Sequence, residues 1–480
     1  MMRTIFILLI ICFTYQLLFA QVKQKNRVII LTDIEADPDD TQSLVRLLLY
    51  ANELDIKGII ATTSVWKKTS TSPQSIKKII KAYGKVQPNL IKHEAGFPDP
   101  EQLLMKVRQG LPKYGMSGVG EGKDSEGSDW IIKILDEDDA RPLWVSVWGG
   151  VNTLAQALYK IKHTKSESET AKLIAKLRVY TISDQDDSGI WIRRNFPNLF
   201  YIVSPGDDYG RATWSAINTY VNGINNETIS NNWLAKNIQQ GHGPLGAEYP
   251  DVAYGMEGDT PSWLTLIPNG LNVPEHPEWG GWGGRYELYI PDFSSQTKGG
   301  SGVPFEPETR AILTNAVDSF TPYIYNAYGR GVEPDTNTFT GNKVTLWRWR
   351  DDFQNDFAAR MDWCTKAYQD ANHPPAPALA HTDHITVTSG KNFALDAGGT
   401  TDPDGDNLSY LWFNYPEAGS YKKMINIDYA LIFFVSQVLY LFLPGSIQIR
   451  LQCCFNSAQS SQSPFYILIT GAFPYLLPLE

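Results

Sequence analysis

Five carboxylates lie close together near the amino terminus of the chain. Residues Asp33–Asp40 read D-I-E-A-D-P-D-D, directly after the apolar run VIIL and directly before a helical pattern. Negative charges at this spacing raise one another's pKa values or destabilise the fold unless something positive compensates. Two interpretations stay open. Oxygen-only ligands of this density favour calcium or magnesium over zinc, whereas the positive end of a helix would suit a solvated, capped helix start.

The elements around this segment predict where its side chains gather. From Arg27 to about Gly241, short apolar runs alternate with helical patterns, which is typical of βαβ units. We therefore predict an α/β fold, with a mostly parallel sheet and helices on both faces. The expected strands are 27–33, 57–64, 142–150, 177–183 and 199–204, and the expected helices are 43–52, 75–84, 129–138 and 152–162. Ligands of such sheets bind at the carboxyl ends of the strands.

Several other side chains follow expected strands and are candidates for substrate binding. Asp184, Asp186 and Asp187 come directly after the strand at 177–183, and Asn152 follows two glycines after the strand at 142–150. Each could contact substrate or cap the next helix. Trp66 could stack on a sugar ring or pack within the protein.

The amino-terminal segment predicts where the protein is located, and the net charge limits the kinds of partner that it can bind. Residues 1–20 carry one early basic residue, an apolar run and a small residue, Ala20, which predicts a signal peptide. The apolar run is shorter than the roughly 20 residues of a membrane span. We expect a secreted protein, periplasmic in a bacterium. The formal charge of −10 argues against a nucleic-acid partner.

Composition divides the rest of the chain. Residues 242–345 are rich in Gly, Pro and Trp and look like an insertion over the active end of the sheet. A Pro/Ala linker at 371–380 separates a main domain at 26–370 from an Ig-like β-sandwich that begins at 381–421. The composition changes abruptly at 422–480. We predict a truncated sandwich and interpret this atypical tail as a gene-model artefact, with a C-terminal anchor as the alternative.

At the acidic segment the chain resembles a known family. The acids at 33, 35, 39 and 40 are similar to the D-x-D-x-x-x-D-D signature of nucleoside hydrolases, calcium-dependent enzymes that cut N-ribosidic bonds. Glu35 stands at the second Asp of that signature, and Asp37 at a usual Gly. The body of the chain resembles the nucleoside-hydrolase-like domain of cellulose-binding Sde182-like proteins. The matching blocks are TSVW (63–66), VWGGVNTLA (147–155), SDQDDSGIWIR (183–193) and MEGDTPSWLTLIPNGLN (256–272).

This resemblance implies a set of metal ligands. They are the carboxylates of Glu35, Asp40 and Asp259, and the backbone carbonyl of Trp148 after its strand. A carbonyl ligand tolerates a change of side chain, so a Trp at this position is compatible with that role. The resemblance implies Ca²⁺ as the cofactor, with Mg²⁺ as the alternative.

It also implies the reaction. Calcium would bind sugar hydroxyls and a nucleophilic water, while Asp39 or Glu35 would act as the base and Asp33 would contact the sugar. The His that usually precedes the late Asp is replaced by Gly258, which removes a leaving-group acid.

We therefore expect a secreted, metal-dependent hydrolase of glycosidic bonds, N-glycosyl bonds first, acting on a nucleoside or a carbohydrate. The alternative is a non-catalytic cellulose- or carbohydrate-binding protein. A G-x-S-x-G elbow and a Cys-His signature are absent from the sequence, which argues against hydrolysis by a nucleophilic Ser or Cys. A third interpretation, a membrane-tethered surface protein, depends only on the atypical tail at 422–480.

Overall fold

A computed structural model describes residues 24–206, 210, 212–292, 302–303, 305–325, 332–386 and 394–420. For 434–435, 445–455 and 465–473 it describes the backbone. The predicted signal peptide lies outside these residues.

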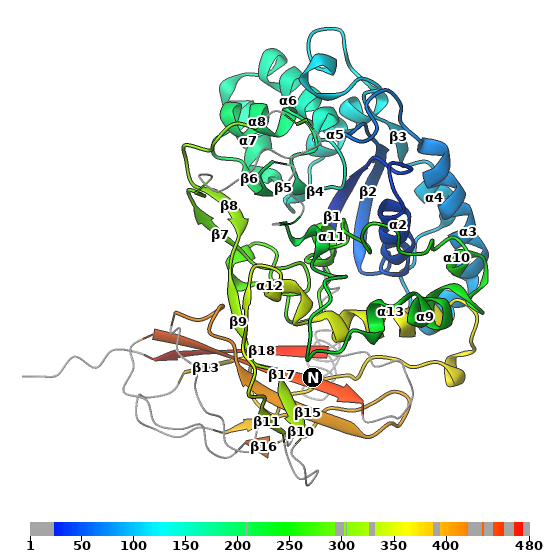
Figure 1. Cartoon of the computed structure of the whole chain (residues 1–480), viewed down its shortest axis with the longest axis vertical. Helices are drawn as coiled ribbons and strands as arrows, with labels where there is room; N and C mark the ends of the chain where they lie inside the picture. Colours follow the sequence, from blue (N-terminus) through cyan, green and yellow to red (C-terminus); the bar gives the residue numbers. More distant parts are fainter. Residues whose placement is uncertain are drawn as a thin grey trace, which may run out of the picture.

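A sheet of eight strands forms the centre of the main domain, in the order β3-β2-β1-β4-β5-β6-β8-β7 (Figure 1). Neighbouring strands from β3 to β8 are parallel, and only β7 runs antiparallel to its neighbour β8. The strands are β1 (Asn26–Thr32), β2 (Leu54–Ala61), β3 (Val107–Gln109), β4 (Leu143–Val147), β5 (Leu177–Ser183), β6 (Phe200–Ser204), β7 (Tyr286–Tyr289) and β8 (Ile312–Asn315). The predicted α/β fold with a mostly parallel sheet is confirmed.

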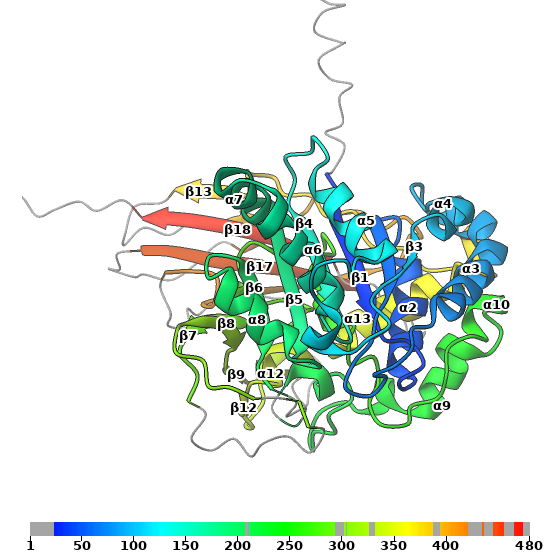
Figure 2. The same ribbon diagram turned by 90° about the horizontal axis from the view of Figure 1, so that it is seen from above.

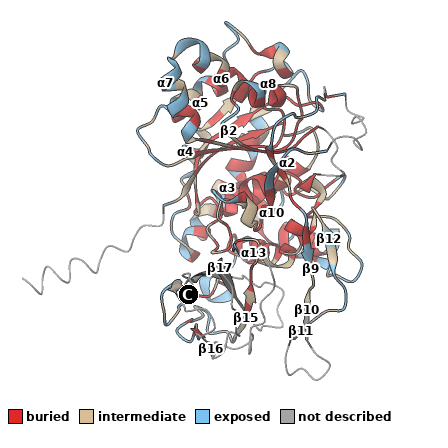
Figure 3. Ribbon diagram, turned by 90° about the vertical axis from the view of Figure 1, so that its left-hand side faces the viewer, coloured by how far each residue is buried: buried red, intermediate tan, exposed pale blue. Residues whose placement is uncertain are grey.

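Apolar side chains on both faces of this sheet explain its position between two helical layers. Along β1, Val28 and Ile30 face one core, whereas Ile29 and Leu31 face the other, as the alternation of a strand requires. Figure 3 shows the sheet between the two layers. One layer contains α5 (Glu126–Leu135), α6 (Asn152–Thr164), α7 (Glu167–Lys176) and α8 (Ser188–Asn195). The other contains α2 (Asp39–Leu49), α3 (Pro73–His93), α10 (Gly243–Gly246), α11 (Pro261–Leu264) and α13 (Arg350–Asp362).

The region predicted as an insertion has two roles. Its strands β7 and β8 extend the edge of the main sheet, while α10 and α11 cover one face. The sequence pattern missed these strands because they are short and lie among Gly- and Pro-rich segments. The remaining short elements are α4 (Pro100–Leu104), α9 (Asn231–Leu234), α12 (Val344–Trp347), β9 (Asp318–Phe320), β10 (Tyr323–Tyr325), β11 (Val332–Pro334) and β12 (Phe339–Gly341), together with one-turn 3₁₀ or π segments at Gly115–Gly118, Thr213–Ser215, Glu227–Ile229, Ala235–Gln239, Pro277–Trp279 and Tyr368–Asp370.

A second sheet follows the linker, and it lies below the main domain in Figure 1 and beside it in Figure 2. Its order is β13-β18-β17-β15, formed by His384–Thr386, Phe465–Phe473, Gly445–Phe455 and Leu408–Asn414, while β14 (Leu395–Asp396) pairs with β16 (Phe434–Val435). Strands from the segment 422–480 thus pair with strands of the predicted sandwich. The origin of that segment stays a prediction.

Aromatic and polar contacts join this second part to the main domain, among them the ring contacts of Trp349 with Phe413 and Tyr415. Arg348, just after α12, pairs with Glu417 at 2.7 Å. His373 in the linker contacts Asp404 at 2.8 Å and His93 of α3 at 3.0 Å. Among the residues that the structure describes, we find no helix with the length and apolar character of a membrane span.

Candidate functional site

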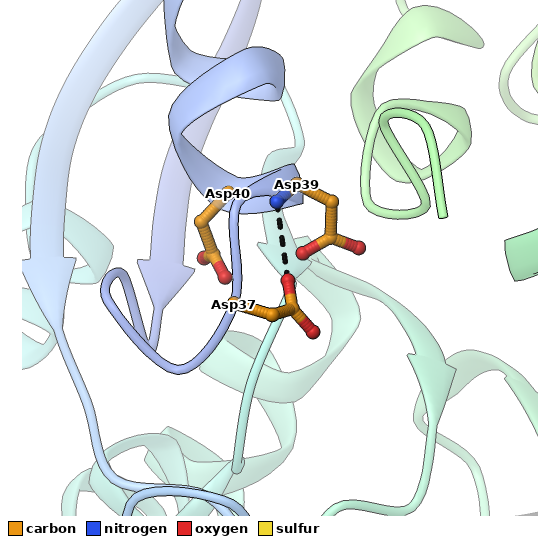
Figure 4. Close-up of side chains that lie close together, drawn as sticks. All are labelled: Asp37, Asp39 and Asp40. Carbon is orange, nitrogen blue, oxygen red and sulfur yellow. Dashed lines mark hydrogen bonds between the residues drawn. The ribbon is translucent and has the colours of Figure 1, made fainter. Parts of the chain in front are cut away.

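The acidic segment forms the loop between β1 and α2, at the carboxyl edge of the sheet. Asp33, Asp39 and Asp40 are buried, and Asp37 is half-buried. Figure 4 shows Asp37, Asp39 and Asp40 around one point at the start of α2. Each of these three offers a carboxylate oxygen, and those oxygens lie within 4.8 Å of one another. The backbone N–H of Asp39 donates to Oδ1 of Asp37 at 3.1 Å.

Burial of several carboxylic acids close together raises their pKa values. The pKa of Asp33 is raised to about 6, mainly by burial and further by the negative charge of Asp37. The pKa values of Asp39 and Asp40 lie well above the ordinary value, first because of burial and then because of neighbouring carboxylates. Asp259 joins the same group, since its pKa is raised well above the ordinary value by burial and then by Asp39. A divalent cation would remove this penalty.

Neighbouring groups hold the acids in place. The hydroxyl of Thr32, the last residue of β1, donates to Oδ1 of Asp40. The indole Nε1–H of Trp214 donates to Oδ2 of Asp39 at 2.8 Å. Asp33 lies against Gly149, where an added Cβ atom would fall 2.5 Å from the Asp33 carboxylate. The glycine therefore allows the close approach of the strand end after β4.

A cavity of about 470 Å³ opens over these acids. Its lining residues are Asp33, Ala36, Asp37, Asp39, Asp40, Trp66, Trp148, Gln185, Trp214, Tyr254 and Asp259. The two aromatic side chains Trp66 and Tyr254 are 56% and 79% exposed, and both lie at the cavity. Such rings at the mouth of a polar cavity suit the apolar face of a sugar or a base.

Two buried oxygens in this cavity lack a hydrogen-bond partner among the described residues. They are Oδ2 of Asp259 and Oε1 of Gln185. The amide nitrogen of Gln185 donates to the carbonyl of Trp148 at 2.5 Å, so the predicted carbonyl ligand already has one partner. An unsatisfied buried oxygen is costly unless a donor or a cation reaches it. The oxygen donors fit a calcium or magnesium ion.

The structure does not bring Glu35 to this group, although we predicted it as a ligand and a base. Its backbone adopts a left-handed conformation with φ 81°, and Glu35 is not among the residues that line the cavity. The carboxylate accepts hydrogen bonds from Ser72, Ser75 and Lys67. The two serine hydroxyls lower the pKa of Glu35 to about 2. Asp37 lies in the cavity instead.

Four predicted substrate-binding residues have partners within the protein, and none of them lines the cavity. Asp184 forms a two-pronged ion pair with Arg193 at 2.8 and 2.9 Å. Asp186 accepts from the backbone N–H groups of Ser188 and Asn152. The side chains of Asp187 and Asn152 contact backbone groups of the segment around η1, the Gly115–Gly118 turn. Asp186 therefore caps the starts of α6 and α8, as the capping interpretation expects, whereas Asp184, Asp187 and Asn152 make other contacts within the protein.

Sequence reasoning missed five cavity residues: Ala36, Asp37, Gln185, Trp214 and Tyr254. Asp37 and Gln185 lie inside segments that the sequence singled out, but the prediction selected residues next to them as the site residues. Trp214 and Tyr254 come from segments without a strand or helix period, so no pattern placed them.

Two family models match parts of the chain. The family model described as "Cellulose-binding Sde182, nucleoside hydrolase-like domain" matches residues 27–286. A second model, "Cellulose-binding protein Sde0182, C-terminal domain", matches residues 392–437, which extends into the segment predicted to be atypical. We found no match among curated proteins.

One solved structure resembles nearly the whole chain. It is described as a nucleoside hydrolase-related hypothetical protein from Saccharophagus degradans that is associated with carbohydrate metabolism. The identity is 35%, the TM-score is 0.76, and the match covers 94% of this chain and 100% of that chain. The effector protein XOO4466 matches at 10% identity with a TM-score of 0.33, covering 61% of this chain and 88% of that chain. That likeness is too weak to inform the site.

Proposed function

Because the chain belongs to the family of cellulose-binding Sde182-like proteins, whose main domain is nucleoside hydrolase-like, we propose that it is a secreted, calcium-dependent hydrolase of N-glycosyl bonds. The observation that carries the proposal is the convergence of Asp37, Asp39 and Asp40 in one cavity. Asp259 and its partnerless buried oxygen face the same cavity and support it.

In this proposal Asp37, Asp39, Asp40 and Asp259 hold the ion, and the Gln185 oxygen is available as a neutral ligand. Calcium supplies a Lewis acid that orients sugar hydroxyls and activates water. Asp37 takes the place that we predicted for Glu35. We retain the carbonyl of Trp148 as a candidate ligand, since a carbonyl oxygen has a second lone pair.

The protein side chains have separate tasks in the reaction. Asp39, which the indole of Trp214 holds in place, would take a proton from the attacking water. Asp33 lies near enough to the cavity to bind a sugar hydroxyl. The surrounding negative charge favours the positive charge that develops at the anomeric carbon. Trp66 and Tyr254 cover the faces of the sugar or the leaving group.

One observation favours a second function, the binding of carbohydrate without turnover. Among the described residues that line the cavity, none is His, Lys or Arg, so a leaving group has no cationic acid there. The exposed aromatic rings and the cellulose-binding description of the family also suit this alternative.

An assay of both activities on the full chain distinguishes the two functions. Nucleosides and soluble oligosaccharides are incubated with the wild type and with Asp39→Asn, in calcium and in chelator, while binding to insoluble cellulose is measured in parallel. The proposal predicts calcium-dependent release of free base or reducing sugar that Asp39→Asn abolishes. Cellulose binding with no release under any condition would favour the binding function.

A further inference from the structure

Two glutamates adopt the left-handed backbone conformation, and each lies two residues before an aspartate of the cavity. Glu35, with φ 81°, precedes Asp37, and Glu257, with φ 52°, precedes Asp259. These are the only two non-glycine residues with positive φ in the part of the chain that the structure describes. A side chain is strained in this conformation, and it persists only where the surroundings impose it. Glycine would be the expected residue if the turn alone mattered.

The carboxylate of Glu35 supplies this constraint on the first loop. It accepts from the hydroxyls of Ser72 and Ser75, at the start of α3, and from Lys67 Nζ at 3.0 Å. The same ammonium group donates to the carbonyl of Ile34 at 2.9 Å. The side chain of Glu35 is therefore held at the start of α3, while Lys67, in the loop after β2, holds both that side chain and the backbone of the turn.

The carboxylate of Glu257 has a matching role in the second loop. It pairs with Arg46 of α2 at 2.7 Å, and both side chains are fully buried. It also accepts from the hydroxyl of Tyr249 at 2.7 Å. The backbone N–H of Glu257 donates to the side chain of Gln42 at 2.9 Å, so α2 holds this turn at two points.

We infer that Glu35 and Glu257 are positioning residues, which hold two strained turns so that Asp37 and Asp259 face the cavity. Neither glutamate lines the cavity. The effect of these glutamates on metal binding rests on the proposed function, since the aspartates need a fixed geometry only if they bind an ion together. Outer partners of this kind commonly change metal affinity when they are removed.

Asparagine offers a sharp test at position 35. Asn tolerates the left-handed conformation, but its side chain is shorter than that of Glu and loses the contacts with α3. We expect Glu35→Asn to lower calcium affinity by about tenfold or more in calorimetry, and Glu35→Gln, which keeps an acceptor at the same reach, to recover part of that loss. Glu275→Asn is the control, because Glu275 is a half-exposed glutamate paired with Arg178 at 2.8 Å.

Tyr249→Phe tests the second turn with little change in packing, because it removes one donor to Glu257 and leaves the buried ion pair intact. We expect a smaller loss of calcium affinity than for Glu35→Asn. Both variants are also crystallised without metal, where the positions of Asp37 and Asp259 are compared with the wild type.

The crystal comparison keeps the inference separate from the proposed function. Displaced aspartates in the variants support the positioning role even if the wild type binds no calcium, a result that would contradict only the proposed function. Aspartates that stay in place in both variants would overturn the inference, as would an unchanged calcium affinity in both variants of a wild type that binds calcium.

Discussion

Trp214 occupies the space beside Gly258: a Cβ atom at position 258 would fall 2.0 Å from the indole Nε1. The same nitrogen donates to Asp39 at 2.8 Å. The resemblance to nucleoside hydrolases identified Gly258 only as the replacement of a His that would protonate the leaving group. In the structure, the missing side chain also makes room for the indole that holds a cavity carboxylate.

Replacing Gly258 by Ala should therefore displace Trp214. Because the added methyl group would overlap the indole ring, we expect a loss of about 1–3 kcal/mol in the free energy of unfolding. Chemical denaturation measures it. Gly341→Ala is the control, because the added Cβ atom there would lie 3.9 Å from its neighbour, an ordinary contact. Equal effects of the two substitutions would contradict the close packing of Trp214.

Trp214→Phe should weaken calcium binding while leaving the fold intact. Phe keeps most of the ring but cannot donate to Asp39, so that carboxylate loses its fixed orientation. We expect a decrease of about 10- to 100-fold in calcium affinity, measured by calorimetry. Trp130→Phe is a matched control, since its indole donates at 2.9 Å to the carbonyl of Lys57. A calcium affinity that does not change in Trp214→Phe would exclude this role.

The stability of the metal-free protein should fall as the pH rises. The pKa of Asp33 increases from 3.8 to about 6 on folding, mainly through burial, and those of Asp39 and Asp40 rise in the same direction. The folded chain therefore holds protons that the unfolded chain has lost, and stability decreases from about pH 4 upward.

Calcium should cancel this decrease, because it compensates the same charges. The increase in melting temperature caused by calcium should grow with pH, and thermal unfolding from about pH 4 to about pH 7.5, in calcium and in chelator, measures it. An increase that is the same at every pH would show that calcium does not bind these carboxylates.

The sequence predicted the elements that build the site better than the directions of its side chains. The strand at 177–183 has the predicted bounds, and the acidic segment lies between a strand and a helix as expected. Short apolar runs carry this information because strands of a sheet that is covered on both faces are buried along almost their whole length. The helix predicted at 75–84 extends over Pro73–His93, because it continues through Pro88, a residue type that usually ends or kinks a helix.

Side-chain directions in loops have no such period. Glu35 and Asp37 are chemically similar, and only the left-handed turn at Glu35 decides which of them faces the cavity. Gln185 lies between Asp184 and Asp186, whose carboxylates form hydrogen bonds with other protein groups. Trp214 contacts Asp39 from a segment that is remote in sequence. These relationships depend on tertiary contacts that a single sequence does not show.

The most direct test of the account is a crystal structure of the wild-type protein grown in abundant calcium, with anomalous scattering to identify the ion. We predict one calcium ion bound by the carboxylates of Asp37, Asp39, Asp40 and Asp259, at about 2.3–2.6 Å from each ligand oxygen. Well-ordered carboxylates with water alone between them would contradict the metal site, and with it the proposed hydrolase.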